Sequence, residues 1–146
     1  MTTGSNICIS VLVISMMAGM VLAEEENGEY AVSLVTNEDF GSYLVNDTGF
    51  AIYYYFDDPG NGTSICYGDC LESWPAFYAE NITVPESLNA SDFTEVVRTD
   101  GAKQTAYKGW PLYFYSEDTE PGDLKGQGAN DAWFLLIPDE FVIIEA

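Results

Sequence analysis

Histidine is absent from the 146-residue chain, and only four residues are Lys or Arg. Without imidazole, the chain cannot build a Ser-His or Cys-His nucleophile system, and it cannot bind zinc, copper or haem through histidine. A general acid or base would have to be a carboxylate, a lysine or a tyrosine. The formal net charge is −20, with 24 acidic residues. Such a surface repels phosphate and has few cations to replace counterions, which argues against binding to nucleic acid or anionic lipid.

The N-terminal segment lacks charged side chains as far as Ala23, and residues 7–22 form an apolar run (ICISVLVISMMAGMVL). This run is short for a membrane span of about 20 residues. Small residues precede position 24, where a signal peptidase would cleave. We expect residues 1–23 to be a cleaved secretory signal and 24–30 an acidic linker, with no membrane insertion after cleavage. The alternative is an uncleaved N-terminal anchor, since no Lys or Arg precedes the run.

Cysteine is scarce, and loss of the signal removes Cys8 and leaves only Cys66 and Cys70. Gly68 between them allows a tight turn that brings the two sulfur atoms together, so in an oxidising compartment we expect a disulfide. The alternative is a redox-active dithiol or a soft-metal site. That alternative is disfavoured because the spacing is not Cys-x-x-Cys and no cation lies nearby in sequence to lower a thiol pKa.

An internal duplication organises the remaining chain. Residues 49–58 (GFAIYYYFDD) and 109–118 (GWPLYFYSED) align at a constant offset of 60 positions. A Pro-Gly pair follows each block, at 59–60 and 121–122, and each unit closes with a tryptophan, Trp74 or Trp133. We therefore expect residues 31–146 to form one tandem-repeat domain, with repeat one at about 31–80 and repeat two at about 94–138.

The aromatic and aliphatic runs between Gly, Pro, Asn and Asp are typical of strands. The expected strands are 31–36, 42–46, 50–56, 94–99, 103–107, 110–115, 132–137 and 141–144. Residues 47–49, 99–101 and 108–109 are expected turns, and 71–74 an expected short helical turn. The predicted fold class is all-β, mainly β with a short helical turn, in which two pseudo-symmetric tandem repeats pack as one globular unit.

These motifs resemble a known family, the secreted-repeat lipoproteins with a Tyr-x-(Phe/Trp/Tyr)-x-x-Asp motif. The motif stands here as Tyr53-x-Tyr55-x-x-Asp58 and Tyr113-x-Tyr115-x-x-Asp118. The similarity continues through 66–70 (CYGDC) and 74–75 (WP) in the first unit, and through 121–123 (PGD), 125–128 (KGQG) and Trp133 in the second. The resemblance implies an extracytoplasmic tandem repeat, but it does not supply a reaction. A lipobox cysteine is missing at the end of the apolar run, so a lipid anchor is not expected.

Alternation places Tyr53 and Tyr55 on one side of their strand and Tyr54 on the other. The simpler interpretation is a β core packed on both faces. The functional alternative is a surface that binds a sugar, a peptide or a protein, and a tyrosine and tryptophan path for electrons is a third reading. The candidate surface residues are Tyr53, Tyr55, Asp58, Trp74, Tyr113, Tyr115, Asp118 and Trp133.

Two acidic loops offer oxygen ligands of the kind that Ca²⁺ prefers, although neither matches the helix-loop-helix calcium pattern. The candidates for a weak calcium site are Asp57, Asp58, Asn61, Asp118, Glu120 and Asp123. The simpler interpretation is turn capping by Asp58 and Asp118. No other cofactor is expected.

Four Asn-x-Ser/Thr sequons give candidate glycosylation sites. They are Asn46, Asn61, Asn81 and Asn89. Their alternative role is that of ordinary turn residues.

Together these patterns predict a secreted or cell-surface protein that is not an enzyme. Its expected role is that of a non-catalytic cell-envelope or binding protein, with a surface protein or a cell-wall glycan as partner. One alternative is an accessory of extracytoplasmic redox or metal handling that uses Cys66 and Cys70. A purely structural coat protein is another.

Overall fold

The computed structural model describes residues 30–141. The expected signal segment, nearly all of the expected linker, and residues 142–144 of the last expected strand lie outside this range. The elements in chain order are β1 (Val32–Asn37), β2 (Gly41–Asn46), β3 (Tyr53–Tyr55), α1 (Asp69–Ser73), η2 (Ala90–Asp92), β4 (Phe93–Val97), β5 (Lys103–Tyr107), β6 (Trp110–Tyr113), β7 (Trp133–Leu135) and η3 (Pro138–Glu140). The predicted all-β class with one short helix is confirmed. No helix within residues 30–141 is long and apolar enough to cross a membrane.

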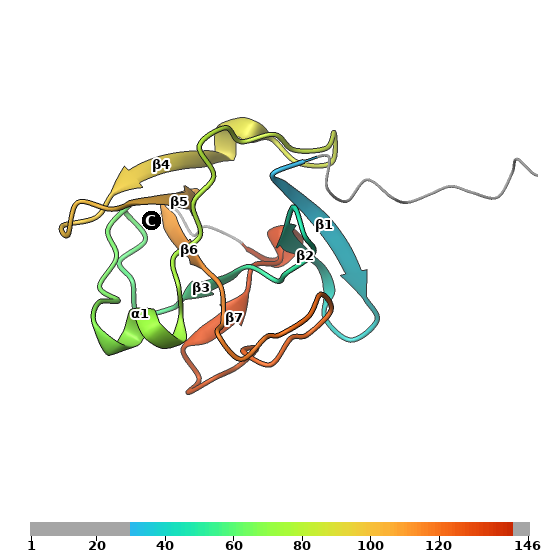
Figure 1. Cartoon of the computed structure of the whole chain (residues 1–146). Helices are drawn as coiled ribbons and strands as arrows, with labels where there is room; N and C mark the ends of the chain where they lie inside the picture. Colours follow the sequence, from blue (N-terminus) through green and yellow to red (C-terminus); the bar gives the residue numbers. More distant parts are fainter. Residues whose placement is uncertain (1–29, 142–146) are drawn as a thin grey trace, which may run out of the picture.

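The strands form two antiparallel sheets (Figure 1). Strands β1 and β2 make a two-stranded hairpin, and the larger sheet has the order β4-β5-β6-β3-β7. Its centre is the pair β3 and β6, one strand from each repeat, in which Tyr53 lies opposite Tyr113. The duplicated tyrosine motifs therefore meet side by side at the middle of the domain.

Each repeat ends beside the central strand of the other repeat. Strand β7 of repeat two pairs with β3 of repeat one, and Ala76 of repeat one forms an antiparallel bridge with Tyr113 of β6. The Leu136 amide donates to the Ile52 carbonyl at 3.1 Å, and the equivalent Phe77 amide donates to the carbonyl before Tyr113 at 2.9 Å. This exchange makes one globular unit from two repeats, as the duplication predicted.

The hydrophobic core consists of two clusters on opposite faces of the central strands. Tyr53 and Tyr113 belong to one cluster, whereas Ile52 and Leu112 belong to the other, and all four are buried. The expected alternation along these strands is confirmed, and both faces are covered.

Turns limit the strands more tightly than the sequence pattern suggested. The expected strands 50–56 and 110–115 shorten to Tyr53–Tyr55 and Trp110–Tyr113. The acidic pair after each motif lies in a turn that follows the strand. Asp58 and Asp118 each donate a backbone hydrogen bond to the carbonyl three residues earlier, both at 3.0 Å. The expected strand at 141–144 does not begin at Phe141, which instead caps η3.

The predicted turn at 108–109 is confirmed as a two-residue hairpin loop. Lys108 and Gly109 have φ angles of 49° and 90°, as a type I′ turn requires. A side chain at Gly109 would collide with the carbonyl oxygen of Gly60 in the loop after β3, so this glycine permits a close approach between the repeats.

Candidate functional site

The two tyrosine motifs bind each other through reciprocal hydrogen bonds. The Tyr53 hydroxyl of repeat one donates to Asp118 Oδ2 of repeat two at 2.7 Å. The Tyr113 hydroxyl of repeat two donates to Asp58 Oδ2 of repeat one, also at 2.7 Å. All four residues are buried. The first and last positions of the motif are thus explained by contacts across the repeat boundary.

Each buried carboxylate is also held by the backbone of its own repeat. The Ile65 amide donates to Asp58 Oδ1 at 2.8 Å, and the Lys125 amide donates to Asp118 Oδ1 at 2.9 Å. Burial raises the pKa of both carboxyls above the usual value, although these hydrogen bonds oppose the shift. Burial and the carboxylate partner together raise the pKa of Tyr53.

The aromatic residues of both repeats form one continuous stack. The indole rings of Trp74 and Trp133 lie parallel, with centroids 3.9 Å apart and 1° between their planes. Tyr55 stacks on Trp133 at 4.2 Å, and Tyr115 stacks on Trp74 at 4.1 Å. Because each tyrosine stacks on the tryptophan of the other repeat, the middle position of the motif is also explained by contact between repeats.

Burial limits what the predicted binding surface can be. Six of the eight candidate residues are in the interior, where they contact the opposite repeat rather than solvent. These six are Tyr53, Asp58, Trp74, Tyr113, Asp118 and Trp133. Tyr55 and Tyr115 keep part of their surface exposed. The motif as a whole is therefore the interface between the repeats.

The predicted disulfide between Cys66 and Cys70 is present, with the two Cα atoms 5.4 Å apart. Cys66 is buried in the cluster that contains both stacked tryptophans. The corresponding position in repeat two is Gly126, whose added Cβ would lie 2.8 Å from the Trp74 ring. Repeat two therefore fills this place with ring atoms, and the bridge belongs to repeat one alone.

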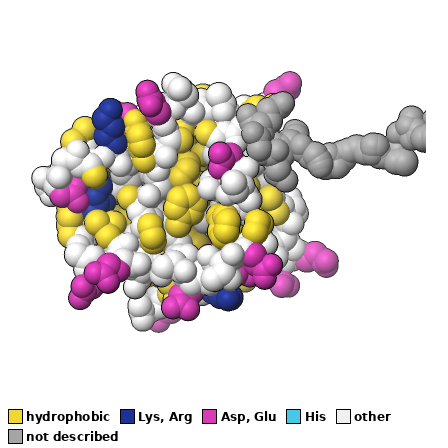
Figure 2. All heavy atoms as spheres, viewed as in Figure 1, with side chains coloured by type: hydrophobic (Ala, Val, Ile, Leu, Met, Phe, Trp, Pro, Cys, Tyr) yellow, Lys and Arg dark blue, Asp and Glu magenta, His cyan; other side chains and the backbone are white. Residues whose placement is uncertain are grey.

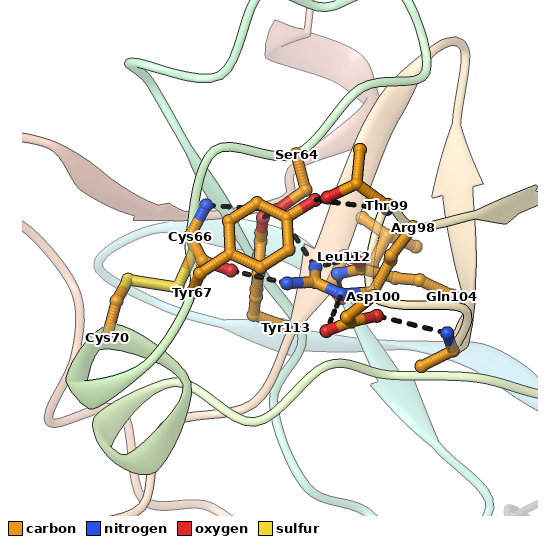
Figure 3. A network of polar contacts seen from close by, with 11 residues as sticks. Ser64, Cys66, Tyr67, Cys70, Arg98, Thr99, Asp100, Gln104, Leu112 and Tyr113 are labelled. Atoms are coloured by element: carbon orange, nitrogen blue, oxygen red, sulfur yellow. Dashed lines mark hydrogen bonds and ion pairs between the residues drawn. A yellow bond between two sulfur atoms is a disulfide. The ribbon is translucent and has the colours of Figure 1, made fainter.

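Arg98 forms the network in Figure 3, which sequence reasoning missed. Its guanidinium is buried and donates to Ser64 Oγ at 2.9 Å, to Gln104 Oε1 at 2.6 Å and to the Cys66 carbonyl. It also lies over the Tyr67 ring, 4.4 Å from the centroid. This cation ties the disulfide loop to the β4-β5 hairpin.

The same network reaches the buried Tyr113–Asp58 pair. Ser64 Oγ lies 2.6 Å from the Tyr113 hydroxyl, and Arg98 opposes the rise in the pKa of Asp58. The available signal was composition: Arg98 is the only arginine in a strongly acidic chain, and a guanidinium, with its five donors, suits a buried network of hydrogen bonds.

The candidate calcium ligands differ in burial and in the contacts that they make. Asp58 and Asp118 face inward, whereas Asp57, Asn61 and Glu120 are exposed. Asp123 accepts from the backbone amides of Thr119 and Glu120 and so stabilises its own turn. Within the described part of the chain, no three His, Cys, Asp or Glu side chains are grouped to hold a metal. Calcium binding stays a prediction.

The four sequons lie outside the core. Asn61, Asn81 and Asn89 are exposed, and Asn46 is half-buried. The side chains of Asn46 and Asn89 accept hydrogen bonds from the backbone two residues later, at 3.1 and 3.0 Å, as asparagines in turns commonly do. Glycosylation at these positions stays a prediction.

The surface offers shallow hollows. Three of them have volumes of about 160, 300 and 230 Å³. Figure 2 shows one face of the molecule, on which apolar side chains gather in the middle and acidic side chains lie mainly around the edge. Within residues 30–141, the large apolar residues that expose more than half of their surface are Phe56, Ile65 and Val97.

Comparison with known proteins gives one result. A family model described as a secreted repeat of unknown function matches the chain twice, over residues 34–77 and 94–136. The first match contains the disulfide and Trp74, and the second contains Trp133, so each covers one repeat. None of the curated proteins and none of the solved structures matches the chain.

Proposed function

The chain belongs to this extracytoplasmic family of secreted repeats, and we propose that it serves there as a non-catalytic binding protein of the cell envelope. The observation that carries the proposal is that the tyrosines and carboxylates of the two motifs already have partners within the protein. The carboxylates and tyrosines of both motifs are bonded to each other inside the protein. What the protein offers a partner is its outer surface.

That surface is rich in carboxylates and poor in free cations. Arg98 is buried, and Lys103 and Lys125 each lie 3.7 Å from a carboxylate oxygen. The partner that suits such a surface is a basic face of another envelope protein or a wall polymer bridged by divalent ions. Exposed apolar side chains such as Phe56 supply the non-polar contacts that protein interfaces need.

The test is co-sedimentation of the exported protein with isolated cell walls and, separately, with the surface-protein fraction of its own host. We expect binding to one fraction that weakens as salt is added, because salt screens exposed charges. Phe56→Ser should weaken binding to a protein partner without changing the melting temperature. Absence of binding to both fractions at low salt would contradict the proposal.

The second candidate function, an accessory of redox or metal handling, depends on Cys66 and Cys70. The pair is oxidised, and Cys66 is buried behind the Arg98 network, which supports a structural bridge. Thiol titration of protein exported by its host separates the two. A stable disulfide supports the first proposal, whereas two reactive thiols with bound metal support the second.

A further inference from the structure

Two buried tyrosines share an environment that suits one-electron oxidation. Tyr53 and Tyr113 each donate a hydrogen bond of 2.7 Å to a buried carboxylate, Asp118 or Asp58. A tyrosine that loses an electron becomes strongly acidic. Its oxidation is therefore easier when a base that can accept the phenolic proton is already hydrogen-bonded to the hydroxyl. Both repeats supply such an acceptor at the same geometry.

The same tyrosines contact the stacked indoles. The Tyr53 ring meets Trp74 edge-on at 5.5 Å, and the Tyr113 ring meets Trp133 edge-on at 5.1 Å. Between them the two indoles stack at 3.9 Å, closer than the usual spacing of aromatic pairs. A positive charge on one indole therefore has a parallel ring over which it can spread.

The stack also reaches the surface. Its outer rings belong to Tyr55 and Tyr115, which are partly exposed. An oxidant that does not enter the protein can therefore contact one end of an unbroken series of rings. The interior beyond those rings excludes water, which would otherwise take the proton away.

We propose that this ring array stores one oxidising equivalent as a buried tyrosyl radical. An outer-sphere one-electron oxidant at the surface removes an electron from the stack and is itself reduced. The resulting indole radical cation takes an electron from Tyr53 or Tyr113. The phenolic proton of that tyrosine moves along its hydrogen bond to the Asp118 or Asp58 carboxylate. The products are a neutral tyrosyl radical, a protonated aspartate and a restored indole, and one external electron reverses every step.

Two further observations agree with this arrangement. Burial raises the pKa of Asp58 and Asp118, so these carboxylates accept a proton more readily than exposed ones. Both repeats place a tyrosine and a carboxylate in this arrangement, so the array has two equivalent sites for the radical.

The test uses the exported protein and photogenerated tris(bipyridine)ruthenium(III) as the one-electron oxidant. Transient absorption and electron paramagnetic resonance distinguish indole from tyrosyl radicals. In wild-type protein we expect a long-lived tyrosyl radical whose formation is slower in D₂O, since a proton moves with the electron. A wild-type protein that yields only an indole radical, or a tyrosyl radical with no solvent isotope effect, would overturn the proposal.

Variants identify the site. The double variant Asp58→Asn/Asp118→Asn keeps acceptor oxygens but removes both bases, and Tyr53→Phe/Tyr113→Phe keeps the rings but removes both hydroxyls. Each should lose the tyrosyl signal and keep the indole radical. Tyr78→Phe is the matched control, because Tyr78 donates to Glu95 at 2.6 Å on the surface without contact to the stack. Loss of the radical in this control, or its survival in either folded double variant, contradicts the proposal.

Discussion

The hydroxyl of Tyr53 offers the sharpest test of how the two repeats are joined. Tyr53→Phe removes a single oxygen and keeps the ring that packs on Trp74. That oxygen donates to Asp118 at 2.7 Å and accepts from the buried Gly126 amide at 3.1 Å. The substitution therefore breaks two hydrogen bonds and leaves two buried groups without these partners.

The magnitude follows from those contacts. A hydrogen bond to a charged group contributes about 1.5–3 kcal/mol, and an unsatisfied buried amide costs about 1–3 kcal/mol. Asp118 can take up a proton when its partner is lost, which limits the total. We expect a fall of about 3 kcal/mol in the free energy of unfolding, and at about 2 kcal/mol per molar urea the midpoint should fall by about 1.5 M.

The assay is urea unfolding followed by tryptophan fluorescence, with Tyr78→Phe as the matched control. The control also removes a tyrosine hydroxyl bonded to a carboxylate, but that pair lies on the surface, so we expect its midpoint to stay near the wild-type value. An equal shift in the two variants would refute the reasoning, because burial between repeats is the difference on which it depends.

Three further predictions concern the core and the turns. Burial places the pKa of Asp58 in the folded protein above its usual value of 3.8. Its contribution to stability is therefore fully present below pH 3.8 and is lost as pH rises through the folded pKa, so Asp58→Asn should reduce the fall in melting temperature as pH rises above about 4. Replacing both Cys66 and Cys70 by Ser should cost about 2 kcal/mol in urea unfolding, the entropy of closing so short a loop. Gly109→Ala should lower the melting temperature more than Gly41→Ala. Both glycines have positive φ, but only at Gly109 would the added Cβ collide with a backbone oxygen. Equal losses in the two variants would exclude the steric contact as the cause.

The sequence pattern was sufficient to locate most strands, although not their ends, because it reports local geometry. The alternation at 52–55 predicted a strand with two covered faces, and Ile52 and Tyr53 lie in opposite core clusters. The turn at Lys108 and Gly109 could be predicted because a glycine stands between two strand patterns, and glycine adopts the positive φ angle of a type I′ turn without strain. The disulfide could be predicted because one pair of cysteines remained and Gly68 lay between them.

The partners of the motif residues could not be predicted from the same pattern. Asp58 looks like an exposed turn residue from its neighbours in sequence, yet it is buried against Tyr113, 55 positions away. Arg98 is linked to Ser64 across 34 positions. Such pairs depend on how the repeats are placed, and a repeat pattern shows that two units exist without showing which residues face each other.

The pairing of each repeat with the central strand of the other explains why the motif residues have partners that are distant in sequence. Each repeat supplies two tyrosines, a carboxylate and a tryptophan. Its first tyrosine donates to the carboxylate of the other repeat, and its second stacks on the tryptophan of the other repeat. A single repeat would leave its aspartate, its ring faces and the edge of its central strand without partners. Since burying any of these alone is costly, two copies reach a stable fold only together. The motif is therefore explained by the pairing of the two repeats, and it places no constraint on the residues of the outer surface.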